Sequence, residues 1–305
     1  MPTPERTRLT WSSRTALKVA GVIAALMAVA VVVALTARAQ ADLGGARSQR
    51  LGTRATPVAG VRSPAPRALA PAPPRASKST PKPITVVGIG DSVTAGKNCD
   101  CQNFVELYAR SLASTRSVKT SSVNLGVSGW TSTQLLQSLT RPGAFRDQVA
   151  KADILLVTIG ANDLVPLETL QSAGCATNCY SALVTSVGQN VRRIVAAARQ
   201  ARTGHPATIL VTNYWNVFQD GDVGTAENGA AFQRWSDLLT RASGAQICDG
   251  ALRAGATCVD LYEPFKGDGS RNPTSLLASD GDHPSPAGHQ LIASTLLAST
   301  PLLIP

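Results

Sequence analysis

From Ile84 onward, short runs of β-branched residues alternate with amphipathic segments of helical period, and this alternation constrains the fold more than any other feature. Alternating strands and helices form parallel sheets with right-handed crossovers and helices on both faces. We therefore expect one three-layer α/β/α domain over residues 84–305, with a parallel sheet of about five strands. The candidate strands are Thr85–Ile89, Val118–Asn124, Ile154–Ile159, Thr208–Thr212 and Thr257–Leu261. The candidate helices are Phe104–Ser114, Thr133–Leu139, Leu183–Arg202, Ala230–Gly244 and Ser285–Ser299.

The positive charge of the chain is confined to the segment before this domain. Residues 1–84 contain 13 Lys or Arg and 2 Asp or Glu, whereas residues 85–305 contain 16 and 17. The net charge of +10 therefore does not describe the folded part, and we exclude nucleic acid as a partner.

An uncharged segment at residues 19–37 follows a basic N-terminus at residues 1–18. As a helix it would span roughly 28 Å, close to the thickness of a bilayer core. The basic residues before it favour a cytoplasmic N-terminus and export of the rest of the chain. Its length favours an uncleaved membrane anchor, but Ala37-Arg38-Ala39 and Ala39-Gln40-Ala41 both fit a signal-peptidase site, so both outcomes stay open.

Residues 38–83 are rich in Ala, Pro, Arg and Ser and have neither helix nor strand periodicity. Such a segment buries too little apolar surface to offset the entropy of ordering, so we predict a disordered linker. The N-terminal part of the chain thus predicts an extracytoplasmic domain, either secreted or held to a membrane by a tether.

All six cysteines follow the linker, in the region that we expect to be exported, and this favours disulfide bonds. Their clustering favours three short-range pairs, although the sequence does not settle the connectivity. A zinc site is disfavoured because it needs thiolates in a reducing compartment, and we expect no metal. The three pairs are Cys99 with Cys101, Cys175 with Cys179, and Cys248 with Cys258.

Four polar stretches fall where strands of a parallel sheet would end. They are "GDSV" (Gly90–Val93), "NLGVSGWTS" (Asn124–Ser132), "IGAND" (Ile159–Asp163) and "SDGDHPSPAGH" (Ser279–His289). Sites in such sheets form at the carboxyl ends of the strands, so we expect these four stretches to converge.

The residue types in these stretches suit acyl transfer. A serine hydroxyl needs a base to become a nucleophile, and the base needs a carboxylate to orient it. Ser92 would be the nucleophile, and His283 the base, with Asp280 or Asp282 close to it in sequence. Backbone N–H groups at Ser92 and at a glycine, together with an Asn amide, would stabilise the oxyanion.

This set of motifs resembles the SGNH, or GDSL-type, esterase and lipase superfamily, whose four blocks carry Ser, Gly, Asn and His in this order. The resemblance implies a flavodoxin-like fold. It makes Ser92 the nucleophile, Gly129 and Asn162 oxyanion donors together with Ser92, and His283 and Asp280 the base and its partner.

Two details of the sequence qualify this resemblance. Val93 stands where the GDSL name has Leu, a position that many members vary. The cysteines at 99 and 101, just after the nucleophile block, resemble those of secreted actinobacterial members. A Gly-x-Ser-x-Gly elbow is absent from the sequence, which excludes the ordinary α/β-hydrolase class.

Several neighbouring residues have other interpretations. Gly126 competes with Gly129 as the oxyanion donor. Asp163 is expected to brace its loop by hydrogen bonding, and His289 to be structural, although it could bind a metal with the acidic residues near His283. His205 carries no signal. Trp130 and Asn213–Trp215 could line a substrate pocket or simply pack.

We therefore predict an exported serine esterase that hydrolyses lipid, acyl-sugar or other small carboxylic esters through an acyl-enzyme on Ser92. We expect no cofactor, a monomer, and a small or envelope-linked ester as substrate. One alternative is an O-acyltransferase that passes the acyl group to an envelope glycan. The other is a non-catalytic wall-binding module.

Overall fold

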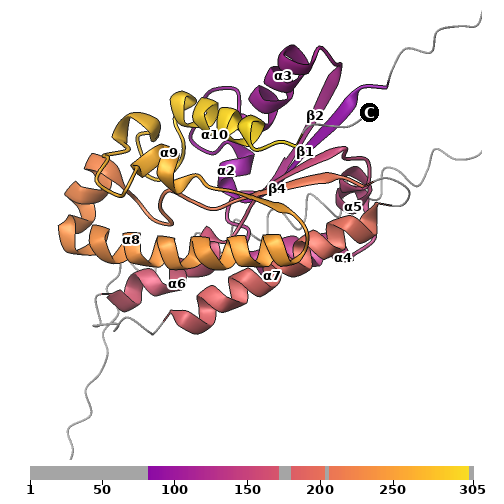
Figure 1. Ribbon diagram of the computed structural model, residues 1–305. Coiled ribbons are helices and arrows are strands. Elements are labelled where there is room, and N and C mark those ends of the chain that lie inside the picture. Colours follow the sequence, from indigo (N-terminus) through magenta and orange to yellow (C-terminus); the bar gives the residue numbers. More distant parts are fainter. Residues whose placement is uncertain (1–81, 172–179, 203–205, 302–305) are drawn as a thin grey trace, which may run out of the picture. The chain divides into compact units, whose positions relative to one another are not determined.

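Five parallel strands form a single sheet in a computed structural model of the protein, which describes residues 82–171, 180–202 and 206–301. The strand order is β2-β1-β3-β4-β5 (Figure 1). This is the order of the flavodoxin-like fold, as the sequence pattern predicts. The strands are β1 (Ile84–Gly90), β2 (Thr120–Gly126), β3 (Ile154–Thr158), β4 (Thr208–Thr212) and β5 (Thr257–Val259).

Helices cover both faces of the sheet, with α3 and α10 on one side and α7 and α8 on the other (Figure 1). The longer helices are α3 (Phe104–Arg116), α4 (Ser132–Thr140), α6 (Ala161–Gln171), α7 (Ser181–Ala201), α8 (Gly221–Arg253) and α10 (Pro286–Ala298). The shorter ones are α2 (Ser92–Ala95), α5 (Ala144–Val149), α9 (Tyr262–Lys266) and the 3-10 turn η1 (Thr274–Leu276).

The strands and most long helices lie within a few residues of their predicted bounds, but α6 (Ala161–Gln171) has no counterpart among the predicted helices, and α8 differs in length. The sequence predicts a helix over Ala230–Gly244, whereas α8 runs from Gly221 to Arg253. The glycines near its start argue against a helix in sequence terms. The structure accommodates them with a break at Gly229, whose φ of 78° separates α8 into two arms.

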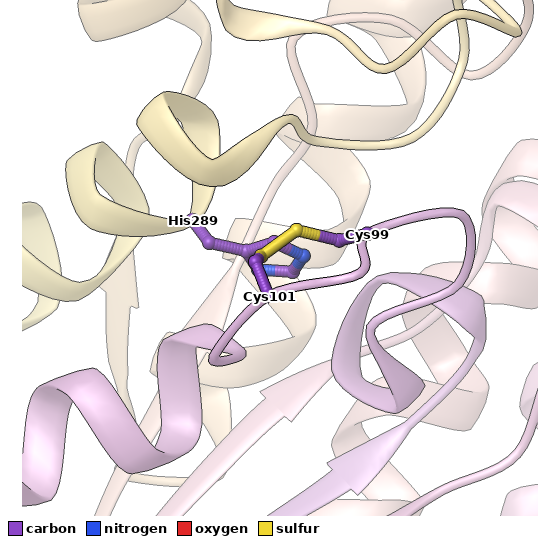
Figure 2. Close-up of side chains that lie close together, drawn as sticks. All are labelled: Cys99, Cys101 and His289. Carbon is purple, nitrogen blue, oxygen red and sulfur yellow. A yellow bond between two sulfur atoms is a disulfide. The ribbon is translucent and has the colours of Figure 1, made fainter.

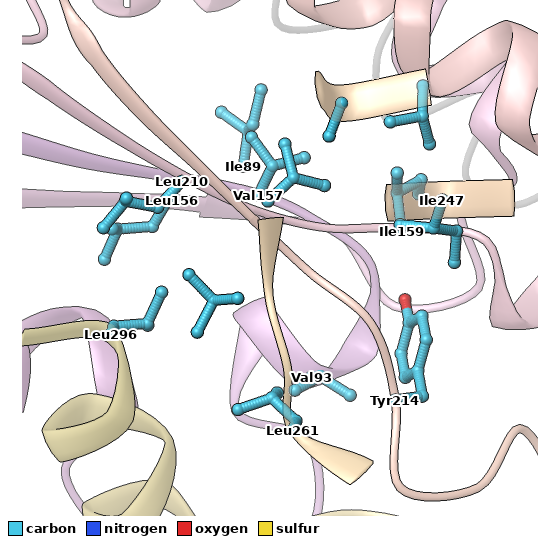
Figure 3. Close-up of a cluster of buried hydrophobic side chains, with 14 of the residues drawn as sticks. Ile89, Val93, Leu156, Val157, Ile159, Leu210, Tyr214, Ile247, Leu261 and Leu296 are labelled. Atoms are coloured by element: carbon cyan, nitrogen blue, oxygen red, sulfur yellow. The ribbon is translucent and has the colours of Figure 1, made fainter. Parts of the chain in front are cut away.

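The core lies between the sheet and its helices. Ile89, Leu156, Val157 and Leu210 are buried in the sheet, and Ile247 from α8 and Leu296 from α10 are buried in the same core (Figure 3). Strands β1 and β3 are buried on both faces, as the central strands of a parallel sheet must be. The buried strands hold the loops at their carboxyl ends in fixed positions.

Two of the three predicted cysteine pairs are present as disulfides, Cys99–Cys101 and Cys248–Cys258. They indicate folding in an oxidising environment. The third predicted pair, Cys175 with Cys179, lies outside the described residues, as do the uncharged segment at 19–37 and the linker at 38–83. Among the described residues, no helix is long and apolar enough to span a membrane.

Candidate active site

The carboxyl ends of the central strands stop at the same level. Gly90 at the end of β1 pairs with Gly126 of β2 on one side and with Thr158 of β3 on the other. A Cβ atom on Gly90 would lie 1.8 Å from the carbonyl oxygen of Thr158, so only glycine fits there. The chain runs from β1 to β2 on one side and then crosses back over β1 to β3 on the other, and ligands bind at this reversal of strand order in such sheets.

Ser92 is the first residue of α2, directly after this glycine, and it is partly exposed. Asp91 caps the short helix, because its Oδ1 atom accepts from the N–H of Val93 at 3.1 Å. Gly96 ends the helix after a single turn in the left-handed conformation. These two caps fix the backbone that carries the Ser92 hydroxyl.

Asp91 is also the centre of a buried polar cluster under Ser92. Its carboxylate accepts from Thr158 Oγ1 at 3.0 Å and from the hydroxyl of Tyr214. Burial raises the pKa of Asp91 to about 6, although the hydrogen bonds from Tyr214, Val93 and Thr158 oppose that shift. The cluster ties the turn that carries Ser92 to the ends of β3 and β4.

The loop before α10 brings His283 to the same edge of the sheet. His283 Nδ1 lies 2.6 Å from Asp280 Oδ2, and its side chain is buried. Asp280 Oδ1 accepts from the backbone N–H groups of Asp282 and His283, both at 3.0 Å. Asp282 is the poorer partner, since its Oδ2 lies 3.6 Å from Nδ1 and its side chain is 42% exposed.

Asn98 adds a further contact to this pair. Its side-chain amide donates to Asp280 Oδ2, the same oxygen that faces the histidine. Burial alone would raise the pKa of Asp280, but the hydrogen bonds from His283, Asp282 and Asn98 together lower it to about 2. No sequence pattern points to Asn98, because it lies 182 positions before Asp280 in the chain.

The two glycines that compete as oxyanion donors are in different environments. The N–H of Gly126 donates to Asn124 Oδ1 at 2.9 Å, so it is already occupied. Gly129 is exposed, has φ of 83°, and its N–H donates to no acceptor within the described residues. Gly129 is therefore the available donor of the two.

Asn162 lies in the first turn of α6, and its Nδ2 atom donates to the carbonyl oxygen of Trp130 at 2.9 Å. This bond joins the second and third polar stretches of the sequence. Asp163 braces the same region as predicted, because its carboxylate accepts from the N–H and the hydroxyl of Ser132 at 2.8 and 2.6 Å. Burial raises the pKa of Asp163 against these hydrogen bonds.

A cavity of about 160 Å³ brings the candidate residues together. Ser92, Asn162 and His283 all line this cavity. Asp280 and Gly129 are not part of its wall, although Asp280 contacts the lining residue His283. Within the described residues no hydrogen bond joins Ser92 to His283, a common state of catalytic pairs without substrate. The remaining lining residues are Asp91, Val93, Ala161, Val165, Tyr214, Trp215, Asn216, Val217, Phe218, Gln219 and Asp282.

The aromatic residues that the sequence marked have mixed roles. Trp215 is buried and stacks on Phe265 at 4.4 Å between ring centroids, which is packing. Trp215 nevertheless contributes to the cavity wall, whereas Trp130 contacts Phe145 at 5.4 Å between ring centroids and lies outside that wall. Tyr214, in contrast, lines the cavity and contacts Asp91. His205 lies outside the described residues.

His289 lies against the Cys99–Cys101 disulfide and does not face the cavity (Figure 2). Its Nδ1 accepts from the N–H of Phe104 at 3.3 Å, and burial lowers its pKa to about 4, so the ring is neutral at pH 7. The two sulfur atoms and a ring nitrogen have the spacing of metal ligands. Because the sulfurs are bonded to each other, they are not thiolates, the form in which cysteine binds metals. His289 is thus a buried packing residue.

Comparison with known proteins agrees with this geometry. Residues 89–291 match the model of the GDSL-like lipase/acylhydrolase family. The chain belongs to this family. The matched region contains every candidate site residue, and the resemblance seen in the four motifs is confirmed. This GDSL hydrolase is therefore a serine ester hydrolase of the SGNH type.

Solved structures of similar fold include two hydrolases. The lipase Lip_vut3 from a goat rumen metagenome is 20% identical, with a TM-score of 0.58, and the match covers 71% of this chain and 97% of that one. The acetylxylan esterase Axe2 from Geobacillus stearothermophilus is 18% identical, with a TM-score of 0.50, covering 71% and 93%. These matches show the shared fold. No curated protein gave a match.

Proposed function

We propose that this GDSL hydrolase is an exported serine esterase that cleaves small acyl groups from carboxylic esters through an acyl-enzyme on Ser92. The observation that carries the proposal is the cavity in which Ser92, Asn162 and His283 meet, with His283 held by Asp280 at 2.6 Å.

In this mechanism His283 takes the proton from the Ser92 hydroxyl. Asp280, ionised because its pKa is about 2, accepts from Nδ1–H and so leaves Nε2 free to act as the base. Ser92 Oγ attacks the ester carbonyl, and His283 then returns the proton to the leaving alcohol. Water, activated by the same histidine, releases the acid and restores Ser92.

The tetrahedral intermediate carries an oxyanion, and three donors are candidates to stabilise it. The N–H groups of Ser92 and Gly129 donate to no acceptor within the described residues, and Asn162 Nδ2 has a second hydrogen beside the one that it gives to Trp130. Each donor in such a hole contributes typically about 2.7–4 kcal/mol to lowering the barrier.

The size of the cavity favours a short acyl group. A volume of about 160 Å³ corresponds to roughly five waters at about 30 Å³ each. Such a space accommodates an acetyl or similarly short acyl group. The buried wall formed by Trp215, Val217 and Phe218 closes it on one side.

Export and tethering are supported by two features of the chain. The uncharged segment at 19–37 follows a basic N-terminus, and the disulfides favour an oxidising compartment. The Pro-rich linker at 38–83 would hold a monomeric domain away from a membrane or within a wall. This location favours esters of the envelope or its surroundings as substrates.

A fluorophosphonate probe followed by peptide mapping tests the nucleophile, and p-nitrophenyl esters of increasing chain length test the acyl preference. We expect one adduct, on Ser92, and a loss of kcat/KM as the acyl chain lengthens beyond about four carbons at this cavity volume. Both Ser92→Ala and His283→Ala should lower kcat by several orders of magnitude without unfolding the protein. A folded protein that forms no adduct and cleaves no ester would refute the proposal.

A further inference from the structure

A second, larger cavity lies beside the candidate active site. It measures about 480 Å³, within the roughly 300–1,000 Å³ usual for ligand sites. The break in α8 at Gly229 forms it, because residues from both arms of the helix line it, including Thr225 before the break and Arg234 after it. The loop that follows α9 closes the other side, and Figure 1 shows α9 opposite the bent end of α8.

A buried ionic cluster forms one wall of this cavity. Lys266 Nζ lies 2.7 Å from Asp220 Oδ2 and 3.1 Å from Asp237 Oδ1, and the lysine side chain is 7% exposed. Asp237 also accepts from Arg241 at 3.0 Å and from the hydroxyl of Tyr262 at 2.6 Å. The two carboxylates are thus balanced by two cations. Lysine has three N–H donors, so one of those on Lys266 is left without a carboxylate.

The remaining charges of the lining are positive. Arg234 and Arg271 both line the cavity, and neither forms an ion pair within the described residues. Arg271 is held in place by a bond of 2.8 Å from Nη1 to the carbonyl oxygen of Pro264. The acidic residues nearest to the lining, Asp222 and Asp268, accept from Asn272 and from the N–H of Ser270 respectively. The cavity therefore has two guanidinium groups available to an anion.

Hydroxyl groups complete the lining. The side-chain hydroxyl of Thr225 makes no hydrogen bond to the described part of the protein, whereas that of Ser270 bonds to the Asp268 carboxylate and keeps its own oxygen available as an acceptor. Such groups, with guanidiniums and a lysine N–H, suit a ligand that is rich in hydroxyl groups and carries negative charge. An apolar ligand would leave all of these donors unpaired.

The wall between the two cavities is thin. Gln219 lines the active-site cavity, and the next residue, Asp220, lines the second one. This wall is joined to the loop of the catalytic pair, because Gln219 Nε2 donates to the carbonyl oxygen of Asp280 at 3.1 Å and Asp220 N–H donates to that of Gly281 at 2.7 Å. Because only the Gln219–Asp220 segment separates the two linings, a substrate whose acyl group lies at Ser92 would have its alcohol part close to the second cavity.

We propose that the cavity between α8 and α9 binds an anionic, hydroxyl-rich segment of the substrate, a glycan or polyol unit that bears a carboxylate or a phosphate. Arg234 and Arg271 would bind its negative charge, and Thr225, Ser270 and Lys266 its oxygen atoms. Its role as a subsite for the alcohol part of an ester rests on the proposed esterase function, whereas the binding itself does not.

Calorimetric titration of the full chain tests the binding with three defined probes. Tetragalacturonate carries carboxylates, an oligomer of glycerol phosphate carries phosphates, and xylotetraose is neutral. We expect at least one anionic oligomer to bind about tenfold more tightly than xylotetraose, with an affinity that falls as salt is added. The anionic oligomer that binds identifies whether carboxylate or phosphate is the natural group.

The double variant Arg234→Gln/Arg271→Gln should weaken that binding about tenfold and leave the thermal unfolding temperature unchanged, since both side chains are exposed. The matched control is Arg110→Gln, an exposed arginine on α3 that should have no effect. Equal affinity for neutral and anionic oligomers, or an unchanged affinity in the double variant, would overturn the proposal.

Hydrolysis of p-nitrophenyl acetate separates this proposal from the esterase function. The acetate does not reach the second cavity, so the double variant should keep the kcat/KM of the natural protein on it. Without any hydrolysis of that ester, the esterase proposal would fail while the binding result would still stand. A double variant that binds normally but loses acetate hydrolysis would contradict the subsite.

Discussion

Substituting Asn98 tests how tightly the catalytic pair must be held. Asn98 donates to Asp280 Oδ2, which also faces His283, while Oδ1 is held by two backbone N–H groups. A hydrogen bond to an ionised group is worth about 1.5–3 kcal/mol. The Asp280 side chain is 27% exposed, so in the variant water will replace part of the stabilisation that the Asn98 hydrogen bond provides. We therefore expect the activation barrier to rise by about 1 kcal/mol, which is a fall of roughly fivefold in kcat.

The backbone at Asn98 decides which substitution is informative. Its φ of 58° is in the left-handed region, where Asn is tolerated and Ala is strained. Asn98→Gly therefore removes only the hydrogen bond, whereas Asn98→Ala adds strain to the loop. Lys97→Ala is the control, since the contact of Lys97 with Ser92 is through its backbone.

Steady-state hydrolysis of a p-nitrophenyl ester measures the effect. Asn98 does not line the active-site cavity, so we expect kcat to fall while KM stays constant. Asn98→Asp should be worse than Asn98→Gly, because it places a second negative charge beside Asp280. Unchanged kcat in Asn98→Gly would show that backbone contacts alone position the aspartate and would refute this reasoning.

Other substitutions give further predictions. Asp280→Asn should lower kcat strongly and Asp282→Asn only slightly, because Asp280 Oδ2 lies 2.6 Å from His283 Nδ1 and Asp282 Oδ2 lies 3.6 Å from it. A larger loss of kcat in Asp282→Asn than in Asp280→Asn, measured with one ester at constant pH, would show that Asp282 is the partner of His283. The folded-state pKa of Asp91, about 6, is above its unfolded value of 3.8, so the stability that this group contributes is full below pH 4 and falls by roughly 3 kcal/mol as the pH rises through 6. Urea unfolding at pH 4 and pH 7 measures this difference in the free energy of unfolding, and the Asp91→Asn variant should not show it. The same pH dependence in the variant and in the natural protein would contradict the prediction. The Cys248–Cys258 disulfide closes a loop with a sequence separation of 10, so its removal should lower the free energy of unfolding by about 2–3 kcal/mol. The double variant Cys248→Ser/Cys258→Ser should therefore unfold at a lower temperature than the natural protein. An unchanged unfolding temperature would show that this bond constrains the chain little.

The sequence predicts the sheet and the contact between Asp280 and His283 well, because both depend on local signals. The β-branched runs mark the strands, and Asp280 lies three positions before His283, close enough to reach its ring. Only the resemblance distinguishes Gly129 from Gly126 in the sequence, whereas the structure adds that the N–H of Gly126 is occupied by Asn124.

Contacts between distant segments could not be predicted in the same way. Asn98 reaches Asp280 across 182 positions, and Tyr214 reaches Asp91 across 123. Neither residue has a local pattern that names its partner. The second cavity was missed for a related reason, since it depends on the angle between the two arms of α8, and the glycines that allow that angle argue against a helix in the sequence.

The direction of β1 separates the point where the linker would join the domain from the active-site cavity. The strand begins at Ile84, where the linker ends, and it delivers Ser92 just beyond its other end, roughly 23 Å away at about 3.3 Å per residue. The chain thus enters the domain on one side and reacts on the opposite side. A linker joined at Ile84 would therefore leave the mouth of the active-site cavity unobstructed, whatever the orientation of the domain, and its reach would set how far into the surroundings the domain can act.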